Sequence, residues 1–82
     1  MIGILLYDDR QHRFIVQERK EGIISDTGEV VDLHCGDTLT IQVKQGLWQD
    51  TRIEKESDDD LYGWYFVGIG SAAPLIGHSA EV

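Results

Sequence analysis

Residues 38–55 read TLTIQVKQGLWQDTRIEK, and this stretch decides the fold. Apolar and polar side chains alternate through its first seven residues, which is typical of a β-strand with one buried and one solvated face. Gln45-Gly46 then supplies the glycine that a tight hairpin turn requires, because glycine adopts positive φ at little cost. We therefore expect residues 47–55 to pair back, antiparallel, on residues 38–44.

The second strand of this hairpin carries unequal faces. Alternation places one set of side chains on each face: Trp48, Asp50, Arg52 and Glu54 on the first, and Leu47, Gln49, Thr51 and Ile53 on the second. Aliphatic residues occur only on the second face, which we expect to cover the core. Trp48 and Arg52 should then be displayed together on the solvent side.

Several other short runs alternate with period two and end at Gly or Asp, which indicates an all-β chain. We expect strands at residues 2–7 and around 14–16, a short hairpin or loop at 23–33, and a strand buried on both faces at 63–70. Pro74 ends that last run, because proline cannot donate a ladder hydrogen bond, and residues 75–82 could close the sheet. About six strands in so short a chain favour a small antiparallel barrel or a strongly bent, SH3-like sheet, since an open sheet exposes its edges.

Length and charge limit the possible functions. The chain has 82 residues, enough for a single β domain spanning residues 1–82. Fifteen acidic residues against seven basic ones give a net charge of −8, which repels nucleic acid and anionic membrane surfaces. No apolar run approaches the ~20 residues that span a bilayer. We expect a soluble protein that binds neither nucleic acid nor membrane.

Cys35 is the single cysteine, so no intrachain disulfide forms, and a reducing, cytoplasmic location is favoured. The apolar N-terminus lacks a basic n-region and meets Asp8-Asp9 too early for a secretory signal. We read it as the first strand.

A set of short motifs follows one order along the chain: Leu33-His34-Cys35-Gly36-Asp37, Trp48, Thr51-Arg52-Ile53-Glu54, Gly63-Trp64-Tyr65-Phe66-Val67-Gly68 and Leu75-Ile76-Gly77. This pattern resembles a small family known only as a domain of unknown function, met in bacteria and on mobile elements and phages. The resemblance covers roughly Gly28 to Val82. It implies a compact β domain and no established activity.

The first candidate site combines aromatic, basic and glycine residues. If residues 47–55 pair with 63–70, an aromatic side chain lies near Trp48 and Arg52, and such a group can stack a nucleobase or anchor a protein partner. The glycine-rich segment that follows offers amides and a hydroxyl to a phosphate. The candidate ligand-binding residues are Trp48, Arg52, Trp64, Tyr65, Gly68, Gly70 and Ser71.

The same residues have an alternative, purely structural interpretation. Both Trp side chains could fill the core, with Arg52 paired to Asp50 or Glu54. The glycines would then form a β-bulge and a loop.

Carboxylates make a second candidate site, a negative surface that imitates nucleic acid and occupies a basic groove on another protein. The acidic residues that could form it are Asp8, Asp9, Asp50, Glu54, Glu56, Asp58, Asp59 and Asp60. We single out Glu54, Asp58, Asp59 and Asp60 as protein-interaction residues. The alternative is that these are solvated loops.

His34 and Cys35, with Asp37, His12 or His78 as partners, invite a nucleophile or a metal site. Adjacent residues on a strand point to opposite faces, however, so His34 and Cys35 can scarcely serve one centre if this stretch is extended. We expect no catalytic residue and no metal ligand here, and a buried thiol beside a turn glycine.

These observations favour a non-catalytic binding protein without a cofactor. In the first hypothesis, a homo-oligomer sequesters a small anionic, nucleotide-like ligand at its interfaces and acts against host defence, with Trp48 or Trp64 stacking the base. In the second, an acidic protein-interaction module or nucleic-acid mimic blocks a host protein. The phage or mobile-element context of both hypotheses is implied by the resemblance alone.

Overall fold

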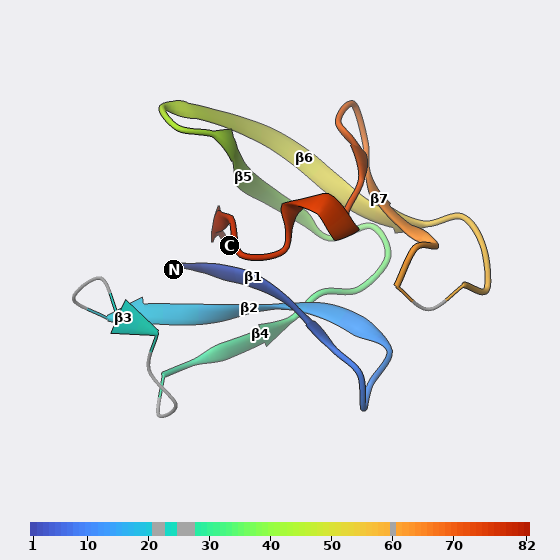
Figure 1. Cartoon of the computed structure of the whole chain (residues 1–82), viewed down its shortest axis with the longest axis horizontal. Helices are drawn as coiled ribbons and strands as arrows, with labels where there is room; N and C mark the ends of the chain where they lie inside the picture. Colours follow the sequence, from blue (N-terminus) through green and yellow to red (C-terminus); the bar gives the residue numbers. More distant parts are fainter. Residues whose placement is uncertain (21–22, 25–27, 60) are drawn as a thin grey trace.

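The computed structural model describes residues 1–20, 23–24, 28–59 and 61–82, and this part of the chain forms nine strands and one 3-10 turn (Figure 1). The elements in order are β1 (Ile2–Asp8), β2 (Arg13–Lys20), β3 (Ile23–Ile24), β4 (Val30–Asp32), β5 (Thr38–Lys44), β6 (Leu47–Lys55), β7 (Trp64–Phe66), β8 (Gly70–Ser71), η1 (Ala73–Leu75) and β9 (Ser79–Glu81). The all-β class is confirmed. No helix within the described residues is long and apolar enough to cross a bilayer.

The strands join into one antiparallel sheet in the order β3-β2-β1-β9-β5-β6-β7-β8, with β4 also paired to β2. The order does not return on itself, so the predicted barrel is not closed. The strand count exceeds the expected six, and the SH3-like arrangement is not confirmed. The last strand does not close the outer edges, because β9 inserts between β1 and β5 and joins the two halves of the sheet.

The sheet is nevertheless strongly bent. Four strands separate β2 from β7 in the pairing order, which in a flat sheet would place them about 24 Å apart at ~4.8 Å per strand. The rings of Phe14 on β2 and Trp64 on β7 lie only 6.2 Å apart, edge to face. In Figure 1, β1, β2 and β4 form one half and β5 and β6 the other, with the C-terminal segment between them.

Bending encloses one core between the two halves. Its buried members come from both: Leu5, Phe14, Val16, Leu33, Leu39, Ile41, Ile53, Trp64, Phe66, Ala72, Leu75 and Ala80. On β5, Leu39 and Ile41 are the inward alternates, as the sequence predicts. A single sheet without a covering helix can bury this much apolar surface only by folding over itself.

The predicted β5–β6 hairpin is confirmed, with Gln45-Gly46 as its turn and Gly46 at φ 77°. The register sets Thr38 opposite Arg52, Thr40 opposite Asp50, and Gln42 opposite Trp48. These residues share the outer, solvent-facing side of the hairpin. The inward side of β6 buries Ile53, whereas Leu47 at the hairpin end is 44% exposed.

The prediction of one long buried strand at residues 63–70 is wrong. Gly68 and Gly70 have φ of 79° and 126°, and the Ile69 amide donates to the Phe66 carbonyl over 3.0 Å. The chain therefore turns after three strand residues and pairs back as β8. In the weakly patterned 23–33 region, β3 and β4 both pair with β2.

Candidate functional site

On the outer side of the β5–β6 hairpin, the register forms three cross-strand rows: Thr38 with Arg52, Thr40 with Asp50, and Gln42 with Trp48. The middle row is extended by β9, because Thr40 also lies opposite Glu81. Glu81, Thr40 and Asp50 therefore stand side by side on three adjacent strands. The Thr40 hydroxyl donates to Asp50 Oδ1 over 2.7 Å, which holds this carboxylate toward the row.

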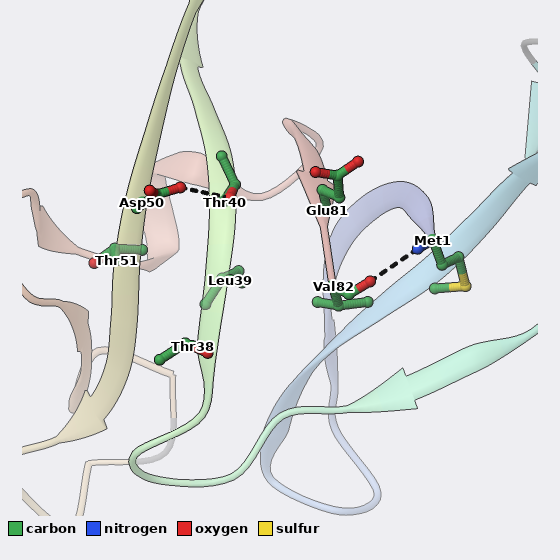
Figure 2. A pocket seen from close by; sticks show the side chains of 8 residues that line it. All are labelled: Met1, Thr38, Leu39, Thr40, Asp50, Thr51, Glu81 and Val82. Atoms are coloured by element: carbon green, nitrogen blue, oxygen red, sulfur yellow. Dashed lines mark hydrogen bonds between the residues drawn. The ribbon is translucent and has the colours of Figure 1, made fainter.

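An open groove of about 580 Å³ follows this row (Figure 2). Its lining residues, here called the acidic groove, are Met1, Thr38, Leu39, Thr40, Asp50, Thr51, Glu81 and Val82. At one end, the Met1 ammonium donates to the Val82 carbonyl over 2.8 Å. Asp50 and Glu81 are both exposed, and neither forms an ion pair with any described residue. The groove therefore offers two exposed carboxylates to a cationic group. The Asp50 carboxylate already accepts from Thr40, and the Met1 ammonium places one positive charge at the end of the groove.

The predicted ligand-binding residues are divided between the two sides of the sheet. Trp48 is 41% exposed on the outer side, but Trp64 is 4% exposed in the core, where its indole N–H has no acceptor in the described residues. The register explains this, because Trp64 lies opposite Lys55 on the inner side and Tyr65 lies opposite Glu54 on the outer side. The alternative interpretation therefore holds for Trp64 and not for Trp48.

Arg52 shares the outer side with Trp48 without meeting it. Four residues along a strand separate the two Cα atoms by about 13 Å. The Arg52 Nε instead lies 3.7 Å from Glu54 Oε2, as the structural alternative expected. One planar ligand cannot stack on Trp48 and use the Arg52 guanidinium as a close clamp.

The glycine segment is built as a hairpin turn between β7 and β8. The Thr51 hydroxyl donates to the Val67 carbonyl over 2.7 Å, and the Gln49 side-chain amide reaches the Gly68 carbonyl at 3.5 Å. Gly70 and Ser71 are exposed members of β8. The segment thus turns carbonyl oxygens toward β6, which is the opposite of what a bound phosphate requires.

Of the predicted protein-interaction residues, Glu54 lies near the end of β6, and Asp58 and Asp59 lie in the loop that follows. Asp58 and Asp59 are exposed, whereas Glu54 is half-buried beside Arg52; Asp60 lies outside the described residues. The Asp59 carboxylate accepts from the Tyr62 amide at 3.4 Å. These carboxylates are separate from the acidic groove.

The expected buried thiol is a wrong prediction, because Cys35 is exposed. Residues 35–36 form a turn between β4 and β5 and not a strand, with Gly36 at φ 92°. The His34 amide donates to Asp37 Oδ2 over 2.8 Å, and His78 Nδ1 lies 2.7 Å from the Gln42 carbonyl oxygen. No cluster of three or more potential metal ligands occurs in the described part of the chain.

The fold and the groove together define a small all-β domain with an exposed acidic face. The chain belongs to DUF5348, a domain of unknown function, whose family pattern matches residues 3–79. The match reaches 25 residues further toward the N-terminus than the resemblance expected from residue 28. No curated protein and no solved structure matches this chain.

The sequence reveals Asp50 as a candidate but misses Glu81. The alternation of Ala80 and Glu81 in the last strand was a signal that one of them faces solvent. The strand's position between β1 and β5 was not visible in the sequence, so nothing indicated that Glu81 would join Asp50 across Thr40.

Proposed function

We propose that this chain is a non-catalytic protein-interaction module that binds a basic segment of a partner protein at the acidic groove. The observation that carries this proposal is the row of Glu81, Thr40 and Asp50, in which two exposed carboxylates flank one hydroxyl. A lysine or arginine side chain seated over Thr40 would meet both carboxylates. This is the second hypothesis from the sequence, centred on Asp50 and Glu81 in the groove in place of Glu54 and the acidic loop after β6.

Trp48 provides an apolar anchor beside the groove. It lies on the same side of β6 as Asp50, one row away, and 41% of its surface is exposed. Exposed Trp residues often dominate protein interfaces, because they bury a large apolar area with few rotatable bonds. The net charge of −8 adds a long-range attraction for a basic partner, which accelerates association at low salt.

Sequestration of an anionic ligand fits this geometry less well. The groove would bring the ligand's negative charge toward two carboxylates, and burial of Trp64 removes one of the two stacking surfaces. The homo-oligomer that this hypothesis requires stays a prediction.

The resemblance to domains of phages and mobile elements supports a host protein, such as a component of a defence system, as the partner. A lone cysteine supports a cytoplasmic encounter.

A charge-matched pair of variants tests the groove, with oligolysine as the probe. The groove variant, Asp50→Asn with Glu81→Gln, removes both groove carboxylates. The control variant, Asp9→Asn with Glu29→Gln, removes two exposed carboxylates elsewhere, one in the β1–β2 turn and one directly before β4. We expect the groove variant to lose about threefold to tenfold in affinity, since each exposed ion pair contributes ~0.2–1 kcal/mol. Equal losses in both variants would refute the groove and leave only the overall charge.

A further inference from the structure

The strand β6 has an open edge over its first half. It pairs with β5 from Leu47 to Arg52, but β7 covers its other side only from Ile53 to Lys55. The β7–β8 turn touches this stretch through the side chains of Gln49 and Thr51, which contact the Gly68 and Val67 carbonyls. Within the described residues, however, no strand pairs with the main chain on that side between Leu47 and Thr51. Although β6 is an inner strand of the sheet, the first half of its β7 side therefore carries unpaired main-chain groups.

The direction of the main-chain groups follows from the hydrogen bonds at the end of β6. The Ile53 amide donates to the Asp37 carbonyl and the Ile53 carbonyl accepts from Gly36, so odd-numbered residues face the β5 side. The Arg52 carbonyl accepts from the Val67 amide over 3.0 Å, so even-numbered residues face the β7 side. The N–H and C=O groups of Trp48 and Asp50 consequently lie in the plane of the sheet and point away from β5, toward the open edge.

Exposed apolar side chains border this edge. Leu47 and Trp48 are 44% and 41% exposed on β6, and Val67, at the point where β7 ends, is 39% exposed. Natural proteins protect open edges with charges, prolines or bulges, because such edges recruit further strands. Here apolar surface and free hydrogen-bonding groups coincide, and Asp50 is the one charge on the outer side between Trp48 and Arg52.

We propose that the partner's basic segment binds as an added β-strand along this edge, in line with β7 and antiparallel to β6. This inference rests on the proposed function and specifies how the basic segment approaches the groove. The added strand lies beside β6, so its side chains reach Asp50, whereas Glu81 on β9 lies three strands away. The backbone of the added strand would exchange hydrogen bonds with the N–H and C=O groups of Trp48 and Asp50. The Arg52 carbonyl is already occupied by Val67, which limits the added strand at that end.

This arrangement determines the chemistry of the partner segment. Residues directly opposite Trp48 and Asp50 place their side chains on the outer side of the sheet, where cross-strand neighbours interact. A lysine or arginine opposite Asp50 pairs with its carboxylate, and one opposite Trp48 lies over the indole ring. The segment is therefore an extended chain with basic residues at alternate positions.

Charge complementarity selects this occupant over a second copy of the chain. An antiparallel pair of β6 edges would align two molecules that each carry −8 and would bring their Asp50 side chains to the same junction. A basic segment neutralises the same carboxylate. Pairing with a second copy is thus an outcome that the test below detects.

Selective backbone methylation of the probe separates strand addition from simple charge attraction. The probe is a capped peptide that alternates lysine and threonine. N-methylation of the lysine amides removes the donors that would face β6, and N-methylation of the threonine amides is the matched control with identical charge. We expect the first peptide to bind about tenfold more weakly than the control or worse, because two hydrogen bonds are lost. Equal binding of both methylated peptides overturns strand addition and leaves the groove proposal standing.

Amide hydrogen exchange provides the second readout on the intact protein. The Trp48 and Asp50 amides should exchange rapidly in the free chain and become protected when the unmethylated peptide saturates it. The Gln49 and Thr51 amides, which face β5, should be protected throughout. Binding without protection at Trp48 and Asp50 overturns the inference, and so does peptide-independent protection that rises with protein concentration, which identifies a second copy on the edge. Absence of any binding overturns the proposed function as well.

Discussion

Gly3 shows how a single residue sets the spacing between β1 and β2. A Cβ added there would lie 2.1 Å from the Gln17 main-chain oxygen, a contact that only a backbone shift can relieve. We expect Gly3→Ala to lower the free energy of unfolding by about 2 kcal/mol or more, measured by urea denaturation. Gly46→Ala is the comparison, because a Cβ at Gly46 meets no atom within 4 Å. A loss at Gly3 no larger than that at Gly46 would contradict this account.

Asp8 gives the turn after β1 a pH dependence. A hydrogen bond from the Gln11 side chain, and then one from the Arg10 amide, both 2.9 Å long, hold the pKa of this carboxyl below its ordinary value of 3.8. A pKa lower in the folded than in the unfolded chain stabilises the fold above the unfolded value, and this stabilisation is lost as the pH falls through the folded value. Thermal melts should therefore show that Asp8→Asn melts lower than the native chain at neutral pH, and that the gap narrows in acid. Asp9→Asn controls for loss of one charge from the same turn, and a gap that widens in acid would oppose the assignment.

At the scale of elements, the β5–β6 hairpin could be predicted because every signal for it is local. Alternation defined both faces, and Gln45-Gly46 defined the turn. The β7–β8 hairpin could not be predicted, because a continuous apolar run masked the turn that Gly68 and Gly70 make at positive φ. The same run left open whether Trp64 lies in the core or on the surface, because its inward orientation is set by its pairing with Lys55.

The β5–β6 hairpin turn depends on a positive φ at Gly46. Its φ of 77° is costly for residues with a Cβ, and the space around it is open, so conformation alone sets the effect. Gly46→Ala should destabilise the chain by about 1 kcal/mol, and Gly46→Asn by less, because asparagine tolerates the left-handed region. Chemical denaturation of the two variants checks the order, and an equal loss in both would show that the turn relaxes to another conformation.

At the scale of the whole molecule, the position of β9 could not be predicted. Its three residues pair with β1 at one end of the chain and with β5 in the middle, and no local pattern encodes such a distant choice. The acidic groove depends on this strand, since Glu81 reaches Asp50 only through it. For the same reason the sequence indicated an acidic binding surface that includes Asp50 but could not add Glu81 to it.

Because the sheet folds over itself, its two halves should unfold as one unit through contacts such as that between Phe14 and Trp64. A double-mutant cycle with Phe14→Leu and Trp64→Leu should give a coupling of about 0.5–1.5 kcal/mol, the range for edge-to-face aromatic pairs. Phe14→Leu combined with Leu47→Ala, an exposed site on β6, is the control and should be additive. Additivity of the Phe14 and Trp64 substitutions within ~0.3 kcal/mol would mean that the halves do not share a core in solution, and the groove that bridges them through β9 would then have no fixed shape.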